Sequence, residues 1–259
     1  MSGGRPKISV VVPFYDDPYI GEALDSVLLQ TYSGSVELIV VDDGSTRESW
    51  RLRSYASKAV IAEKPNGGTA SALNLGFGRA SGDYVAWLSS DDRFLPRKLE
   101  EQLRFMESTG AWVSHTAFRE IDERGRRNGA PVYARFDGMS RFCESFLTGN
   151  VVNGCTVMMR RELFDRLGGF DEALPYTHDY DFWVRCLLAG YPISYLDRPL
   201  TEYRRHPRMG SVRYRDAIER EFRAVLASYH PRLQRLLQAM TPPSSRPPGD
   251  GSEAAWRSG

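Results

Sequence analysis

Two pairs of aspartates stand where apolar, strand-like segments of the chain end. Asp42 and Asp43 follow one such segment, and Asp91 and Asp92 follow another. Carboxylates at strand ends can hydrogen-bond a ribose or a base, and they can ligate a hard cation such as Mg²⁺, which takes oxygen ligands. Aspartate is also common in turns and at helix N-caps, so one pair alone would favour a turn. Two pairs, together with the glycine turn that follows Asn66, favour a ligand site.

Strands and helices alternate around these carboxylates. Apolar, often β-branched runs predict buried strands at residues 8–13, 37–41, 59–62 and 83–88. Other spacings predict helices at residues 19–30, 48–57, about 68–80, and from Pro96 to about 106. This order is typical of an α/β fold with a mixed, mostly parallel sheet flanked by helices. Because ligands bind beyond the carboxyl ends of such strands, we expect the polar segments 13–17, 42–45 and 89–92 to converge on one crevice.

The alternation loosens after about residue 110. We predict strands at 112–118 and 157–160, a charged turn at 122–128, and helices at 140–147, 161–167 and 180–188. Apolar residues at helical spacing between 214 and 240 predict two amphipathic helices, broken at Pro231. The segment 241–259 is rich in proline, serine and glycine, which predicts a disordered tail.

Composition excludes several classes of protein. The 259 residues have a net charge of +1 and no block of like charges, so no nucleic-acid partner is expected. No apolar run approaches the roughly 18 residues that a membrane helix needs, and no apolar signal region precedes the first strand. We therefore expect a soluble, cytoplasmic protein. The three cysteines match no zinc or disulfide pattern, which favours buried thiols.

Several phosphate-binding and catalytic motifs are missing from the sequence. There is no Gly-x-x-x-x-Gly-Lys-Ser/Thr loop, and no Gly-x-Ser-x-Gly nucleophile motif. The partial dinucleotide motif at Gly76 and Gly78 has Ser81 in place of its third glycine. Any phosphates would therefore be held mainly by a metal ion and by side chains.

An ordered set of motifs resembles the family-2 inverting glycosyltransferases of the GT-A (Rossmann-like) fold. In the first half these motifs are Val-Val-Val-Pro-Phe-Tyr at 10–15, Val-Val-Asp-Asp-Gly-Ser at 40–45, Asn-Gly-Gly at 66–68, Ala-Leu-Asn at 72–74, and Ser-Asp-Asp at 90–92 with Pro96. In the second half they are Asn-Gly at 153–154, Gly-Gly-Phe-Asp-Glu at 168–172, His-Asp-Tyr-Asp-Phe-Trp-Val-Arg at 178–185, and Tyr-Arg-Arg-His at 203–206. The resemblance covers about residues 7–211.

The resemblance implies a role for each matching residue. The expected nucleotide contacts are Pro13, Tyr15, Asp42, Asp43, Asn66 and Asp91. The expected ligands of a Mn²⁺ or Mg²⁺ ion are Asp91, Asp92 and His206. The expected catalytic base is Asp179, and the residues expected near the acceptor or a phosphate are His178, Asn153 and Arg204.

Three positions depart from the family pattern. Ser89 stands where many relatives have the first aspartate of the metal motif, so the ribose contact is weakened or shifts to Asp91. His178 stands where the common form has glutamate before the base. The helix after Asn66 lacks an arginine that relatives often carry, which leaves Arg79, Arg204 or Arg205 to supply a phosphate contact.

The implied protein has a GT-A domain at residues 1–215, with a nucleotide-binding half at about 7–110, an acceptor half at about 111–212, and a helical extension at 216–240. Its expected reaction moves a sugar from a nucleotide-diphosphate donor to a hydroxyl of a glycan, a lipid-linked acceptor or a small molecule. Two alternatives stay open: a sugar-nucleotidyltransferase, although residues 13–17 are acidic where its basic glycine-rich loop should be, and a non-catalytic nucleotide-sugar-binding module. The C-terminal helices could touch a membrane surface, but docking on the domain is favoured.

Overall fold

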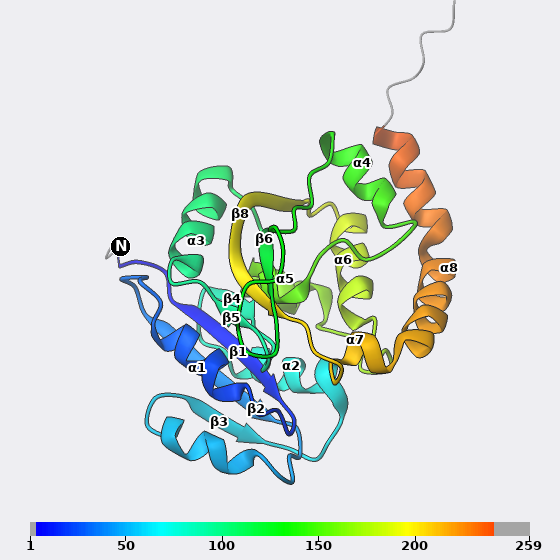
Figure 1. Ribbon diagram of the computed structural model, residues 1–259. Helices are drawn as coiled ribbons and strands as arrows, with labels where there is room; N and C mark the ends of the chain where they lie inside the picture. The colour runs from blue at the N-terminus through cyan, green and yellow to red at the C-terminus, as the bar shows by residue number, and fades with distance from the viewer. Residues whose placement is uncertain (1–3, 241–259) are drawn as a thin grey trace, which may run out of the picture.

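An eight-stranded sheet organises residues 4–240, the part of the chain that the computed structural model describes. Its strand order is β3-β2-β1-β4-β7-β6-β8-β5. Strands β1 to β4 are parallel to one another, whereas β7 is antiparallel to both of its neighbours. Helices cover both faces of the sheet (Figure 1). The predicted mixed, mostly parallel α/β architecture is therefore confirmed.

The parallel half of the sheet follows the predicted alternation closely. Its elements are β1 (Ile8–Phe14), α1 (Ile20–Leu28), β2 (Val36–Asp42), the 3₁₀ helix η1 (Ser49–Tyr55), β3 (Val60–Glu63), α2 (Gly68–Arg79) and β4 (Tyr84–Trp87). The β-branched residues of β1 are buried on both faces of the sheet, as expected of a central parallel strand. Helix α2 packs directly on β1 at Gly76, where a Cβ atom would lie only 2.3 Å from Val11 Cγ1.

The second half contains two strands that the sequence pattern did not reveal. Its elements are β5 (Arg93–Phe94), α3 (Lys98–Thr109), β6 (Val113–Ile121), α4 (Gly138–Ser145), the 3₁₀ helix η2 (Gly154–Thr156), β7 (Met158–Arg160), α5 (Arg161–Leu167), α6 (His178–Leu188) and β8 (Ile193–Arg204). Strand β5 is too short to give a periodic signal, and β8 is interrupted in sequence by Asp197, Arg198 and Pro199. The pairing of β8 with β6 shifts register there, so its alternation of apolar residues is lost.

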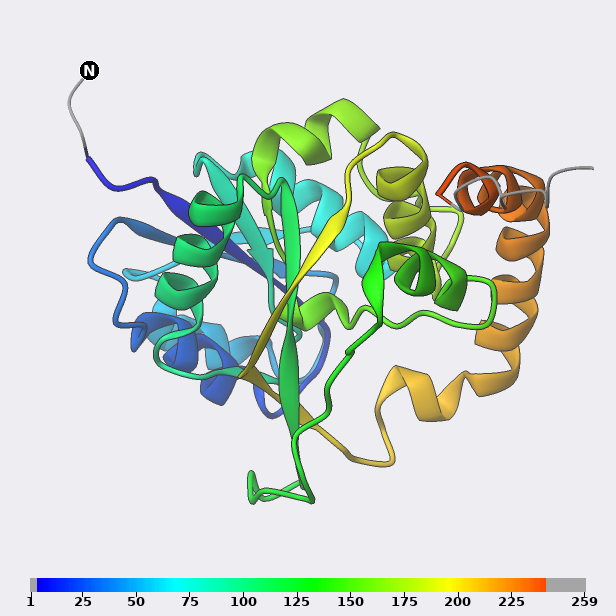
Figure 2. The ribbon, with the colours of Figure 1, turned by 90° about the horizontal axis from the view of Figure 1, so that it is seen from above.

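The last two elements of the described residues are α7 (Gly210–Arg213) and a single long helix, α8 (Arg215–Met240). The prediction of two helices broken at Pro231 was wrong, because α8 continues through that residue. Proline removes one helical hydrogen bond, which can kink a helix without ending it, and the axis of α8 turns along its length (Figure 2). The buried side chains of Val225 and Leu233 join α8 to the core near α4 and α6. The predicted disordered tail, 241–259, lies outside the described residues.

The sheet separates two apolar cores. One contains Val11, Ile39 and the inner faces of α2 and α6, and the other contains Val10, Val40 and the inner faces of α1 and α3. No helix within residues 4–240 has the length and apolar character needed to cross a membrane. Because both faces of the sheet are buried, the strands are held in one register. The loops at the carboxyl ends of these strands therefore have fixed positions.

Candidate active site

A small cavity of about 270 Å³ lies at the carboxyl ends of β1 and β4. Its lining includes five of the residues expected to meet a nucleotide or a metal, namely Pro13, Tyr15, Asp43, Asp91 and His206. The predicted convergence of the three polar segments is therefore confirmed for the first and third segments and for Asp43 of the second. The parallel pairing of β1 with β2 and β4 brings their carboxyl ends to one edge.

A large cavity of about 730 Å³ adjoins the small one. The two share five lining residues, which are Thr69, Ser89, Asp91, Met209 and Gly210. The wall of the large cavity also contains Asn153, His178 and Asp179 from the second half of the chain. Asp91 and Asp179 thus face one connected space, although they are far apart in sequence.

Asp91 and His206 form the polar centre of the small cavity. The Nε2 atom of His206 lies 3.0 Å from Oδ2 of Asp91, and its ring packs against the ring of Tyr19 with centroids 5.4 Å apart. Asp17 lines the same cavity and accepts a hydrogen bond of 2.7 Å from the Ser90 hydroxyl. Burial, and then the charge of Asp91, raise the pKa of the Asp17 carboxyl.

These groups can hold a divalent cation only with help from a ligand. Within residues 4–240, no three His, Cys, Asp or Glu side chains gather closely enough to hold a metal by themselves. Mg²⁺ is commonly bound by one or two carboxylates together with substrate phosphates. Asp91 is partly exposed, and Nδ1 of His206 is buried without a hydrogen-bond partner in the described part of the chain. This donor set fits a cation that is shared with a diphosphate.

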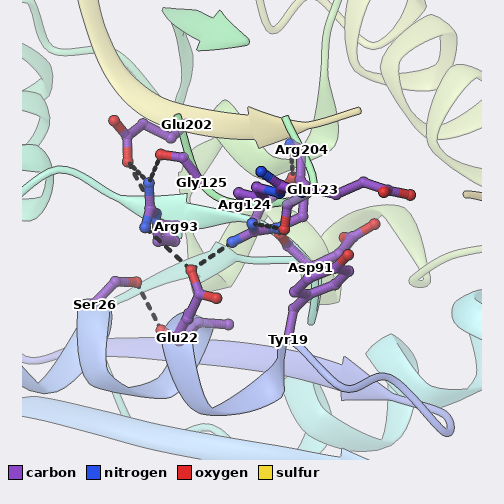
Figure 3. A network of polar contacts seen from close by, with 12 residues as sticks. Tyr19, Glu22, Ser26, Asp91, Arg93, Glu123, Arg124, Gly125, Glu202 and Arg204 are labelled. Atoms are coloured by element: carbon purple, nitrogen blue, oxygen red, sulfur yellow. Dashed lines mark hydrogen bonds and ion pairs between the residues drawn. The ribbon is translucent and has the colours of Figure 1, made fainter. Parts of the chain in front are cut away.

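Asp92 and Arg204, which the resemblance places near the metal and a phosphate, are fully buried and line neither the small nor the large cavity. The backbone N–H of Arg204 donates to Asp92 Oδ1 at 2.8 Å. The guanidinium of Arg204 donates to the Asp91 carbonyl at 2.7 Å and to Glu22 at 2.6 Å (Figure 3). Burial, and then the charge of Asp91, raise the pKa of Asp92 well above its usual range. Among residues 4–240, its Oδ2 atom has no hydrogen-bond partner.

Asp42 and Asp43 point into different hollows, because successive side chains of an extended segment alternate. The Asp42 carboxylate accepts a hydrogen bond from the Ser45 backbone. It lines a separate hollow with Lys64 and lines neither the small nor the large cavity. The Asp43 carboxylate accepts from Lys64 Nζ at 2.6 Å and from the backbone N–H groups of Gly67 and Gly68.

Asn66 braces the same loop. Its side-chain amide donates to the Asp43 carbonyl at 3.0 Å, and it lines neither cavity. Asp43 and Asn66 therefore fix the turn that opens α2, and Asp43 is the one of the two that also reaches the small cavity.

Asp179 stands in the first turn of α6, at the wall of the large cavity. Its Oδ2 atom accepts a hydrogen bond of 2.8 Å from the side-chain amide of Asn150, and Oδ1 accepts from the Tyr180 backbone N–H at 2.7 Å. Burial raises the pKa of the Asp179 carboxyl above its usual range, while these hydrogen bonds and His178 act in the opposite direction. A carboxylate with a raised pKa, held in one orientation, suits a general base.

His178 and Trp87 pack together beside this carboxylate. Their ring centroids lie 5.7 Å apart, and both residues are buried in the wall of the large cavity. Burial lowers the pKa of His178, which keeps the ring neutral at neutral pH. Gly154 allows Trp87 to sit close to η2, because a Cβ atom at that residue would lie 2.1 Å from Cζ3 of the indole. Asn153 lines the cavity, but its side-chain oxygen caps η2 by accepting from the Cys155 N–H.

Three residues of the site were not singled out from the sequence: Asp17, Asn150 and Arg208. Asp17 lies in a segment marked only as polar. Ser89, noted from the sequence, forms a 2.9 Å hydrogen bond with the Cys155 thiol. Asn150 gave no signal, because an isolated asparagine in a loop has many uses. Arg208 lines the small cavity, whereas Arg79 ends α2 and Arg205 pairs with Glu120 at 2.6 Å. Of the arginines within residues 4–240, Arg208 is the one that lines the small cavity.

The fold is an α/β domain with cavities at the carboxyl ends of its parallel strands, and comparison with known proteins identifies its family. The profile of glycosyl transferase family 2 matches residues 9–168, so the chain belongs to that family. An uncharacterized glycosyltransferase of Rickettsia prowazekii is 35% identical over 190 residues, which cover 70% of this chain and 58% of that relative. The chain thus spans less than two thirds of the length of that relative, and 35% of the length of a similar protein from Rickettsia felis.

Two solved structures show the same GT-A fold. The structure of S. aureus TarS 1–349 in complex with UDP-GlcNAc is similar with a TM-score of 0.71 at 21% identity, covering 89% of this chain and 70% of that one. The mannosyltransferase PcManGT from Pyrobaculum calidifontis, in complex with GDP-Man and Mn²⁺, is similar with a TM-score of 0.67 at 20% identity, covering 92% of this chain and 70% of that one. The expectation of a family-2, GT-A protein is confirmed.

Proposed function

We propose that this chain is an inverting glycosyltransferase, which moves a sugar from a nucleotide-diphosphate donor to an acceptor hydroxyl. One observation carries the proposal: Asp91 lines both cavities, and Asp179 lines the large one. A group suited to bind a cation and a group suited to act as a base thus open into one connected space. Single displacement needs both groups, on opposite sides of the transferred sugar.

The proposed reaction uses Asp179 as general base. Its carboxylate accepts the proton of the acceptor hydroxyl while that oxygen forms a bond to the anomeric carbon of the donor sugar. The bond from the same carbon to the diphosphate oxygen breaks, and its electron pair leaves with the nucleoside diphosphate. Because attack and departure occur on opposite faces, the configuration inverts and no second carboxylate is needed as a nucleophile. Asn150 holds Asp179 in place through their 2.8 Å hydrogen bond.

The small cavity is the proposed donor site. Pro13, Tyr15 and Asp43 would contact the nucleoside, and Asp91 and His206 would hold Mn²⁺ or Mg²⁺ against the diphosphate. Such a cation, when bound, neutralises negative charge that grows on the leaving diphosphate. Asp92 is left out of this ligand set because its carboxyl is buried away from the cavity.

Arg208 is the proposed partner of a phosphate, since it lines the small cavity. The nucleotide-sugar complexes of TarS and PcManGT support a donor of this class for the shared fold. A base contact by Asp42 and a phosphate contact by Arg204 are not part of the proposal.

A thermal-shift screen tests the donor site. Nucleoside diphosphates and nucleotide sugars, with and without Mn²⁺, should raise the melting temperature by mass action, and the best donor should do so most strongly with the cation. Hydrolysis of that donor by the protein would then separate an enzyme from a binding module. Release of pyrophosphate from a nucleoside triphosphate would instead indicate a sugar-nucleotidyltransferase, and absence of any nucleotide binding would contradict the proposal.

A further inference from the structure

The large cavity differs from the small one in its charge. Among residues 4–240, no lysine or arginine lines the large cavity, whereas Arg208 lines the small one. The ionisable carboxyl groups of the large cavity are Asp91 and Asp179. An anionic group placed beside Asp179 would therefore lose water and meet a carboxylate, with no lysine or arginine in the wall of the large cavity to offset its charge.

The two histidines of the large cavity do not supply the missing charge. His115 and His178 are both almost fully buried in its wall. Burial lowers the pKa of His115 to about 4 and lowers that of His178 as well, so both rings are neutral at neutral pH. Among residues 4–240, the Nε2 atom of His115 and the Nε1 atom of Trp87 have no hydrogen-bond partner.

Two arginines close in sequence to lining residues of the large cavity are bound to carboxylates. Arg135 follows two lining residues in sequence, but its guanidinium donates to Asp197 at 2.9 Å. Arg205 lies two residues after Tyr203, and it pairs with Glu120 at 2.6 Å. Turning either arginine into the cavity would break an existing ion pair.

Aromatic rings make up much of the rest of the wall. Strands β4, β6 and β8 contribute Trp87, Phe118 and Tyr203, respectively. The segment between β6 and α4 contributes Tyr133 and Phe136, and the segment before α6 contributes Tyr176. The apolar face of a sugar ring packs well on such side chains, and sugar hydroxyls can both donate and accept hydrogen bonds. A neutral sugar thus matches the rings, the uncharged polar atoms and the lack of cations at the same time.

We infer that the large cavity receives the acceptor as a neutral sugar, and that it selects against acceptors whose reacting residue carries a carboxylate or a phosphate. This inference rests on the proposed function, because it assigns the acceptor to the cavity that contains Asp179. It adds a substrate class that neither the family nor the fold specifies. The selection comes from the wall itself: a charged acceptor would gain no ion pair in return for its lost hydration.

Matched pairs of sugars test the inference by binding, without need of turnover. Methyl β-glucoside is compared with methyl β-glucuronide, and methyl α-mannoside with its 6-phosphate, by saturation-transfer NMR on the full chain with Mg²⁺ and the nucleoside diphosphate that binds best. Each neutral member should bind at least about tenfold more tightly than its anionic partner, which corresponds to about 1.4 kcal/mol. Equal or tighter binding of the anionic members would overturn the inference, and so would failure of every sugar to bind at 50 mM.

A charge-insertion variant tests whether the cavity wall is the cause. Val132 is 40% exposed and lines the large cavity, whereas Val60 is 46% exposed on the edge strand β3 and lines neither cavity. Val132→Lys should raise the affinity for the anionic members, relative to the neutral ones, by about fivefold, and Val60→Lys should leave the ratio unchanged. Tyr133→Lys provides a second position if Val132→Lys unfolds. An unchanged ratio in the folded cavity variants would overturn the inference.

A different measurement, of nucleotide-sugar binding and hydrolysis, tests the proposed function. If no nucleotide sugar binds or is hydrolysed, the transferase assignment is lost, whatever the sugars do. If donor hydrolysis proceeds while anionic sugars bind best, the transferase stands and the inference about the acceptor is wrong.

Discussion

The guanidinium of Arg204 and the carboxylate of Glu22 form a 2.6 Å ion pair that joins the end of β8 to α1. Arg204 is fully buried, and its other donors reach the backbone carbonyl groups of Asp91, Asp122 and Glu123. Its charge also lies 4.2 Å from the centroid of the Tyr19 ring. One side chain therefore connects the Asp91 loop, the turn after β6 and the first helix (Figure 3).

The first prediction concerns the stability that this arginine provides. Arg204→Met should lower the free energy of unfolding by about 3–5 kcal/mol, because it leaves several buried carbonyl groups without a donor. Arg205→Met is the matched control: its guanidinium is half exposed, so the loss of its pair with Glu120 should cost less than about 1 kcal/mol. Urea denaturation of both variants measures the difference. Equal, small losses would show that the Arg204 network does not stabilise the fold.

The second prediction tests Asp179 as the base. Asp179→Asn should abolish transfer to the acceptor, because the amide cannot accept the hydroxyl proton, while donor binding in the small cavity should persist. Asp181→Asn is a useful comparison: Asp181 lies in the same helical turn, but its carboxylate is bound to Arg185 and Tyr229. Transfer assays and nucleotide-sugar titrations measure the two effects. Appreciable turnover by Asp179→Asn would disprove the base assignment.

The third prediction follows from the raised pKa of Asp179. A general base must be deprotonated, so kcat/KM should fall as the pH drops through a pKa that lies above the usual value of aspartate, near 3.9. The hydrogen bond from Asn150 lowers this pKa, and Asn150→Ala should therefore move the acid limb of the profile to higher pH. A limb that stays in place, or that moves to lower pH, would show that Asn150 does not stabilise the carboxylate.

The fourth prediction concerns the cation. EDTA should stop transfer and Mn²⁺ or Mg²⁺ should restore it, while Asp91→Asn and His206→Ala should each weaken binding of Mn²⁺ in the presence of nucleoside diphosphate by at least about tenfold. His230→Ala on α8 is the control, because His230 lines neither cavity. Electron paramagnetic resonance of Mn²⁺ measures binding without any turnover. Unchanged Mn²⁺ affinity in Asp91→Asn would remove that residue from the proposed ligands.

The sequence predicted the parallel half of the fold well because its signals are local. The β-branched run of β1 indicates a buried strand, and the polar residues after it indicate a loop. Because the carboxyl ends of parallel strands meet at one edge of a sheet, the convergence of these loops near Asp91 could be predicted. Strand β8 could not, because its pairing with β6 depends on residues far away in sequence and shifts register near Pro199. Arg204 shows the limit for single residues: its motif suggested a ligand contact, but its burial depends on Glu22, 182 positions away.

The last prediction is the effect of His115 on stability against pH. In the folded protein burial lowers the pKa of His115 to about 4, whereas an unfolded histidine titrates near 6.5. Below pH 6.5 the unfolded state binds the additional proton, so the stability that depends on neutral His115 is present above pH 6.5 and is lost as the pH falls towards 4. The loss should be about 3 kcal/mol.

His115→Phe isolates this contribution, because phenylalanine keeps an aromatic ring beside Tyr195 and Phe142 but cannot titrate. The free energies of unfolding of the two proteins should be measured at several pH values between 7.5 and 4. The wild type should lose about 3 kcal/mol more than the variant over this range, since all other titrating groups are shared. His230→Phe serves as the control for a histidine outside both cavities. Parallel curves for wild type and His115→Phe would mean that His115 is hydrated, and that the large cavity is open to water at its deepest histidine.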